Sequence, residues 1–205
     1  MTAPLPPAPT TRKARATYET IIDATRAVVR RRGTVSPELI ADHAQVSPAT
    51  FYTYFSSKDG ALAAAFDSAL TDMSHDLDNA LSIETLLETG LESTMRTLVR
   101  TVVKGFTHEA RIFRLAISRL PDSDLVRQVY RHHEKAILER LERFIRLGTA
   151  ANQIRADHPE TLAAALLVSI QGFQNPLLLR QGSAPVADEL AQMLAALLAV
   201  SPTDR

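Results

Sequence analysis

Small, hydroxylic and phenolic side chains follow one another in a short stretch of the chain, and none of them is acidic. They are Ala49, Thr50, Tyr52, Thr53 and Tyr54, and Lys58 comes shortly after. Hydroxyl groups and helix N-terminal amides donate hydrogen bonds to phosphate oxygens, and small side chains allow close approach to the edges of DNA bases. An ammonium group adds an ion pair with phosphate. These residues therefore suit contact with double-stranded DNA if one element presents them together.

The surrounding sequence predicts such an element. The pair Ser36-Pro37 recurs as Ser47-Pro48 eleven residues later. Serine caps a helix N-terminus through its side-chain oxygen, and proline suits the first helical position because an amide there would be unpaired. The spacing predicts two short helices separated by a tight turn at Gln45-Val46. This is the pattern of a helix-turn-helix, whose second helix enters the major groove. Its expected apolar contacts are Ile40, Ala41, Ala44, Val46, Phe51 and Phe55.

The predicted DNA-binding residues are the side chains left outside those contacts, together with the capping residues and the lysine. A simpler interpretation also fits, in which two capped helices pack and the aromatic residues at 51–55 are only core. The combination of caps, hydroxyls and lysine favours DNA binding. The predicted set is Ser36, Ser47, Pro48, Ala49, Thr50, Tyr52, Thr53, Tyr54 and Lys58.

Over about residues 18–66 the chain resembles the tetracycline-repressor (TetR) family of bacterial transcriptional regulators. The resemblance rests on an apolar first helix ending in glycine, an Ile-Ala pair, a turn, a Ser-x-x-Thr-x-Tyr-x-x-Phe motif, Ser-Lys and Leu. These elements read Ile21-Ile22 through Gly33, Ile40-Ala41, Ser47, Thr50-Phe51-Tyr52, Phe55, Ser57-Lys58 and Leu62. The resemblance implies a dimer that in most cases represses transcription, and a small effector that shifts the spacing of two DNA-binding heads. It also implies a four-helix dimer interface made by two C-terminal helices of each subunit.

Two positions depart from the family pattern. The segment from Gly33 to Ile40 is short, which predicts a tightened loop before the second helix. Gln45 stands where the family often has glycine, and glutamine is strained there if the turn needs a positive φ.

Composition predicts an all-α protein. Helix formers dominate the 205 residues, and apolar residues recur at three- and four-residue spacing. The sequence has no cysteine, which excludes a disulfide framework and a thiolate site. We find no apolar stretch of the length that a signal peptide or a membrane span needs, so we expect a soluble cytoplasmic protein.

The zero net charge divides unevenly along the chain. Residues 1–60 hold eight Lys and Arg against five Asp and Glu, and the remainder holds 15 against 18. The N-terminal part is therefore basic by three charges and the rest acidic by three. This distribution supports DNA binding by the N-terminal part, and a dimer would double it.

We predict three segments. Residues 1–15 form a flexible N-terminal arm, whose basic end lies on DNA or is a solvated tail. Residues 16–60 form a three-helix DNA-binding domain with a helix-turn-helix, whose first helix spans 16–32. Residues 61–205 form a helical bundle for effector binding and dimerisation. A long helix over 58–81 joins the two domains, and Gly148 ends a later helix that begins near residue 124.

Apolar stripes in the second domain predict an effector site. Polar-tipped Tyr130 and His133 lie on an otherwise apolar stripe. They either read a ligand or are core residues hydrogen-bonded to backbone. The predicted effector-binding set is Met95, Leu98, Phe106, Phe113, Tyr130, His133, Ile137 and Phe173.

The last helices are expected to form the dimer interface. The helix that runs to Ile170 is apolar on nearly all sides, so a partner subunit is its simplest cover. Pro176 should kink or end it. The predicted interface residues are Leu166, Ile170, Leu190, Leu194 and Leu197.

No catalytic constellation, cofactor motif or metal-ligand spacing emerges, so we do not expect an enzyme. The sequence predicts a homodimeric regulator, most simply a repressor released from an inverted-repeat DNA operator by a small, mainly apolar effector. A ligand-independent regulator or activator is the alternative. A small-molecule-binding enzyme or carrier with a vestigial head is less well supported. The operator, the regulated genes and the effector are not encoded in any recognisable pattern.

Overall fold

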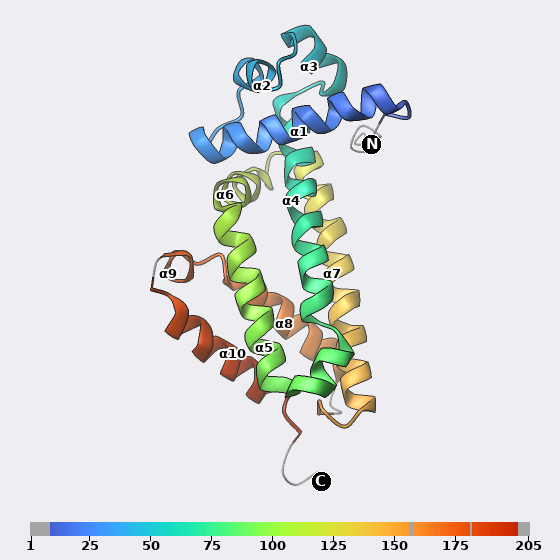
Figure 1. The fold of residues 1–205 in the computed structure, drawn as a ribbon, viewed down its shortest axis with the longest axis vertical. Helices are drawn as coiled ribbons and strands as arrows, with labels where there is room; N and C mark the ends of the chain where they lie inside the picture. Colours follow the sequence, from blue (N-terminus) through green and yellow to red (C-terminus); the bar gives the residue numbers. More distant parts are fainter. Residues whose placement is uncertain (1–8, 156–157, 181, 201–205) are drawn as a thin grey trace. The chain divides into compact units, whose positions relative to one another are not determined.

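The computed structural model describes residues 9–155, 158–180 and 182–200, and these contain α-helices without a single strand (Figure 1). The all-α prediction is therefore confirmed. The helices are α1 (Arg12–Arg32), α2 (Pro37–His43), α3 (Pro48–Tyr54), α4 (Lys58–Ala80), α5 (Ile83–His108), α6 (Ala110–Arg119), α7 (Asp124–Ala150), α8 (Pro159–Gly172), α9 (Pro176–Leu179) and α10 (Ala184–Leu198).

The chain divides into two compact units. The first unit holds the described residues up to Thr71 together with Glu109–His133, and the second holds Asp72–His108 and the described residues from Glu134 onward. The unit boundaries differ from the predicted division at residue 60. The reason is that α6 packs with the N-terminal helices. Its Phe113 ring, for example, meets the Phe66 ring of α4 edge-on at 5.4 Å between centroids.

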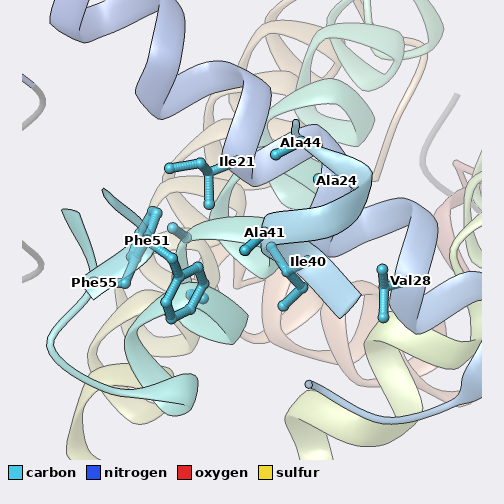
Figure 2. Close-up of a cluster of buried hydrophobic side chains, with 10 residues drawn as sticks. Ile21, Ala24, Val28, Ile40, Ala41, Ala44, Phe51 and Phe55 are labelled. Atoms are coloured by element: carbon cyan, nitrogen blue, oxygen red, sulfur yellow. The ribbon is translucent and has the colours of Figure 1, made fainter. Parts of the chain in front are cut away.

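One buried cluster holds α1, α2, α3 and the start of α4 together (Figure 2). Phe51 and Phe55 are fully buried, and their ring centroids lie 5.8 Å apart. Small residues let the helices approach closely, and Tyr18 of α1 stacks on Phe55 at 5.1 Å. The cluster consists of Ile21, Ala24, Val28, Ile40, Ala41, Ala44, Phe51, Phe55, Ala61 and Ala64.

The first helix begins earlier than predicted. The Thr11 hydroxyl accepts a hydrogen bond from the Ala14 amide at 3.3 Å, and the Arg15 amide donates to the Thr11 carbonyl at 2.9 Å. Threonine is a good N-cap, so α1 starts at Arg12 rather than at residue 16. The basic residues assigned to a flexible arm are therefore the first turn of a helix. Residues 1–8 of that arm lie outside the described residues.

Two glycines shape the long helices. Gly90 has non-helical φ 80° and ψ 167°, and it divides α5. Gly148, predicted to end α7, is buried within it, and α7 continues to Ala150. A Cβ at Gly148 would lie 2.5 Å from Ile154 and 3.1 Å from Leu86. Glycine is needed there because the side chains of Ile154 and Leu86 pack directly on the helix backbone.

In the second unit, α10 packs along α5. Asp188 of α10 joins the contact through ion pairs to Arg100 at 3.1 Å and Arg96 at 3.9 Å. The helix α8 ends at Gly172, before Pro176, and this proline instead begins the short α9, where Asn175 is the N-cap. None of the described helices has both the length and the apolar character that crossing a membrane requires.

Candidate nucleic-acid interface

The helix α3 separates its side chains into a buried and an exposed set. Phe51 is completely buried, whereas Ala49, Tyr52 and Thr53 are exposed. Residues three and four apart lie on the same face of a helix, so these three side chains share one surface. Tyr52 is 52% exposed, and its ring meets that of Phe51 edge-on. The exposed face of α3 therefore offers the hydroxyl groups of Tyr52 and Thr53 and the methyl groups of Ala49 and Thr53.

Serine caps fix where α2 and α3 begin, as predicted. The Ser36 hydroxyl accepts from the Leu39 amide at 3.4 Å, and the Ser47 hydroxyl accepts from the Thr50 amide at 3.0 Å. The hydroxyls of Ser47 and Thr50 also lie 2.9 Å apart. Pro48 is exposed at the first position of α3. The Thr53 hydroxyl donates to the Ala49 carbonyl at 3.0 Å, which leaves its acceptor lone pairs available.

The turn between α2 and α3 is a Schellman motif. The Val46 amide donates to the Ala41 carbonyl at 2.9 Å, and the Gln45 amide donates to the Asp42 carbonyl at 3.1 Å. The residue between these helices takes the left-handed conformation in such a motif, and Gln45 has φ 55°. The positive φ on which the predicted strain at Gln45 depends is therefore present. The turn keeps its geometry at a local conformational cost.

Tyr54 and Lys58 differ in exposure. Tyr54 is half-buried against the core cluster, with its ring centroid 6.3 Å from that of Tyr18. Its ring thus belongs partly to the core. Lys58 is exposed at the first position of α4, whose start is capped by the Ser57 hydroxyl accepting from the Gly60 amide at 3.1 Å.

The start of α1 is positively charged in an unusual way. Its first turn carries Arg12, Lys13 and Arg15 and no acidic residue. A helix N-terminus carries a partial positive charge, so cationic side chains are unfavourable there. An anion bound at this end of α1 would be favoured. The start of α2 shows the opposite case. There the backbone amide of Glu38 and the Ser36 hydroxyl, by hydrogen bonding to the Glu38 carboxylate, lower the pKa of Glu38 below its ordinary value.

Comparison with known families bears on this same region. Residues 21–65 match the bacterial regulatory proteins of the tetR family. Residues 21–65 are therefore similar to the TetR-family domain. The match covers the buried residues of α1, which run from Ile21 to Val29, the whole helix-turn-helix and the start of α4. No curated protein matches the chain.

Solved structures of TetR-family regulators share the fold of this chain over 90–93% of its length. A TetR-family transcriptional regulator from Mesorhizobium loti is 20% identical, with a TM-score of 0.76 over 93% of this chain and 100% of that one. A TetR transcription regulator from Haloarcula marismortui is 19% identical, with a TM-score of 0.74 over 90% and 99%. SmeT of Stenotrophomonas maltophilia in complex with triclosan is 16% identical, with a TM-score of 0.70 over 91% and 93%.

Beyond the TetR-family domain, the predicted effector residues divide between the two units. Phe113, Tyr130 and His133 belong to the first unit and the other five to the second. The apolar members Met95, Leu98, Phe106, Phe113 and Phe173 are buried.

His133 has a partner that neither sequence interpretation named. Its Nε2 lies 2.8 Å from a carboxylate oxygen of Asp67 on α4, within the first unit. The same Asp67 carboxylate also acts on Tyr18 of α1. Burial of the Tyr18 phenol, and secondly the negative charge of Asp67, raise the pKa of Tyr18 above its ordinary value. The ring of His133 thus contacts a carboxylate rather than the expected backbone group.

A hollow of about 550 Å³ in the second unit was not predicted. It lies between the turn joining α4 to α5 and one side of α7, and none of the predicted effector residues lines it. Its lining mixes charged Asp78, Glu84, Arg140 and Arg143 with apolar Leu81, Phe144 and Leu147. No sequence signal identified it, because its walls come from segments about 60 residues apart. Within the described residues, no group of three His, Cys, Asp or Glu side chains is placed to hold a metal ion.

The predicted dimer residues differ in their exposure within the single chain. Leu166, Ile170 and Leu194 are buried within the chain itself, and Leu190 and Leu197 are half-buried. The apolar stripe of α10 packs along α5, so this stripe is not available to a second subunit. The large apolar side chains that α8, α9 and α10 leave exposed are different ones: Val168, Leu177, Val186 and Met193.

Proposed function

We propose that the chain is a homodimeric transcriptional regulator, acting as a repressor that a small, mainly apolar effector releases from an inverted-repeat operator. The observation that carries the DNA-binding part is the exposed face of α3 inside the TetR-family domain. In the chain's second segment, residues 61–205, the proposal places effector binding and dimerisation. The chain works as a regulator in this proposal, not as an enzyme.

The proposed DNA contacts fall into two kinds. Ala49 and Thr53 approach base edges, because they are exposed on one face of α3 and do not belong to the buried cluster. Tyr52 and Lys58 contact phosphates through a phenol and an ammonium. Ser47 and Pro48 bring the amino end of α3 toward the DNA backbone. The other three residues, Ser36, Thr50 and Tyr54, support the fold of the interface. The cations in the first turn of α1 add phosphate contacts beside the operator.

Dimerisation follows from the small size of the reading surface. One short helix reads too few bases to find a site among the ~10⁶ or more competitors in a genome. Two heads related by a two-fold axis read an inverted repeat. We propose that Val168 of α8 and Met193 of α10, which are 68% and 65% exposed, lie in the interface.

Two observations support the proposed control by an effector. The predicted apolar residues Met95, Leu98 and Phe106 are fully or nearly fully buried in the second unit, and SmeT, which has the same fold, forms a complex with triclosan. An effector that binds the DNA-incompatible state a hundredfold better weakens operator affinity by about 2.7 kcal/mol. A protein that binds DNA equally well with and without any small apolar compound would be a ligand-independent regulator.

The test is selection of bound duplexes from random DNA by the wild-type chain. An enriched inverted repeat supports the proposal, and failure to enrich any sequence contradicts it. Repeating the selection with Ala49→Ser and Thr53→Ala should change the preferred bases at defined positions, each lost contact costing about 1–3 kcal/mol there. The preferred sequence staying the same in both variants would place base reading outside α3.

A further inference from the structure

Charged side chains at both ends of α6 contact the helices that carry the recognition helix. All of these residues belong to the first unit. At its start, Glu109 occupies the N-cap position but makes no capping hydrogen bond, and its side chain is turned toward α1 instead. A Glu109 carboxylate oxygen lies 2.6 Å from an Arg26 guanidinium nitrogen and 3.7 Å from one of Arg30. Glu109 is only 4% exposed, so this contact is shielded from solvent.

Arg111 contacts the carboxyl end of α1. One guanidinium nitrogen donates to the Arg30 carbonyl at 2.8 Å and to the Arg31 carbonyl at 2.7 Å. The last carbonyls of a helix have no partner within it, so a cation that binds them both satisfies them and complements the negative end of the helix. The second residue of α6 therefore closes the last turn of α1.

The other end of α6 contacts the start of α4. An Arg119 guanidinium nitrogen lies 2.9 Å from a carboxylate oxygen of Asp59, the residue next to Lys58. The bond and the charge of Asp59 raise the pKa of Arg119 above its ordinary value. Since α1 and the start of α4 both pack on α2 and α3 in the buried cluster, contacts from α6 reach both sides of the helix-turn-helix.

We propose that Glu109, Arg111 and Arg119 are positioning residues, which hold α1 and the first turn of α4 in the arrangement that lets α3 and Lys58 contact DNA together. The inference rests on the proposed DNA-binding function. None of these residues belongs to the exposed face of α3, so they act on binding through the helices they hold. Loss of the contacts should reduce binding to the specific site more than binding to unrelated DNA. Specific binding needs α3 and Lys58 in register, whereas non-specific binding needs only charge.

The chain offers a matched pair for the test. Arg111→Met and Arg114→Met each remove one positive charge from α6. Among the described residues, Arg114 is exposed and contacts no hydrogen-bond or ion-pair partner, whereas Arg111 binds α1. Both variants are measured against the site selected by the wild-type chain and against an unrelated duplex of equal length, at one salt concentration. Circular dichroism at the assay temperature measures the folded fraction of each.

Arg111→Met should bind the selected site about tenfold more weakly, with affinity for the unrelated duplex changed by less than about twofold. Arg114→Met should match the wild type on both. Arg111→Lys keeps the charge but loses the guanidinium fork, and should fall between the two. If Arg111→Met does not fold, Glu109→Gln replaces it. This variant keeps the size of the side chain and should show the same selective loss.

Either of two results would overturn the inference. One is a folded Arg111→Met or Glu109→Gln variant that binds the selected site as tightly as the wild type. The other is an equal loss on both duplexes in the Arg111 and Arg114 variants, which would show that only net charge matters. A wild-type chain that selects no site contradicts the proposed function instead, so the two failures are distinguishable.

Discussion

The exposed faces of α3 and of α8 and α10 are built from opposite kinds of side chain. On α3 the large apolar residue, Phe51, is buried, and hydroxyl-bearing Tyr52 and Thr53 are exposed. On α8 and α10 large leucines are buried, and yet Val168 and Met193 remain more than 60% exposed. Both regions thus satisfy an internal core first. They differ in the kind of side chain that remains exposed for contact with a partner.

This difference indicates two kinds of partner. A surface of hydroxyls beside a lysine suits a hydrated, anionic partner such as DNA. An exposed valine and methionine, on helices whose large leucines are buried or half-buried, gain by contact with another protein surface. Burial of a large side chain therefore identifies the core, and only the exposed residues distinguish one interface from the other.

The comparison can be tested most strongly at Phe51, where α3 depends on its buried side. Phe51→Ala should reduce the free energy of unfolding of the first unit by about 3–5 kcal/mol, because it leaves a cavity in a closely packed cluster. Tyr52→Ala is the matched control, since its ring is half exposed. It should change stability by well under half of that amount while weakening DNA binding. Urea unfolding of both variants is the measurement, and equal losses would show that α3 has no distinct buried side.

Substitution of the exposed apolar residues of α8 and α10 should have the next largest effect, which is on dimerisation. The double variant Val168→Glu with Met193→Glu should weaken the dimer by about 2 kcal/mol or more, because it places charges in an apolar interface. Sedimentation at micromolar concentration measures it. Leu147→Glu, which charges an exposed apolar position on α7, should leave the association unchanged. A wild-type chain that sediments as a monomer would remove the basis of the comparison.

Lys58 tests the electrostatic side of the comparison. Lys58→Ala should lower the magnitude of the slope of log affinity against log salt by about one unit, since one phosphate contact is lost. Lys135→Ala is the control. It removes the same charge from a side chain of the second unit that is 79% exposed, and it should leave the slope unchanged. The same slope for Lys58→Ala and the wild type would contradict the assigned contact.

The smallest effect concerns the turn that orients α3. Gln45→Gly should raise the stability of the first unit by about 0.5–1 kcal/mol, because glycine adopts φ near 55° without the strain that a side chain adds. Gln45→Ala keeps a Cβ and should give no such gain. Thermal unfolding of the three proteins separates the cases. A gain from alanine as large as that from glycine would mean that conformational strain at this position is not the cause.

Local interactions made much of the first unit predictable. Ser36 and Ser47 bind amides three residues away, and Gln45 lies within one turn of its hydrogen-bond partners, so the sequence contains both ends of each interaction. The early start of α1 was within reach by the same reasoning. Thr11 is an ordinary N-cap residue, and it binds an amide three residues away, so the signal for the start of α1 is local as well.

Contacts between distant segments were not predictable in the same way. Gly148 looked like a helix end, and only the side chains of Leu86 and Ile154 show that it is a packing site. The apolar pattern of α10 is the same whether it faces α5 or a second subunit, so periodicity could not choose between Leu194 and Met193 as an interface residue.

The sequence by itself determined the helices, the caps, the turn and the motif that matches the tetR family, because each depends on residues within a few positions of one another. Tertiary structure alone decided which apolar faces are covered within the chain. It also decided that His133 pairs with Asp67, and that α6 binds the carbonyls of a helix about 80 residues earlier. Hydrophobic burial is non-directional, and an ion pair requires only proximity, so neither leaves a spacing in the sequence from which its partner can be identified.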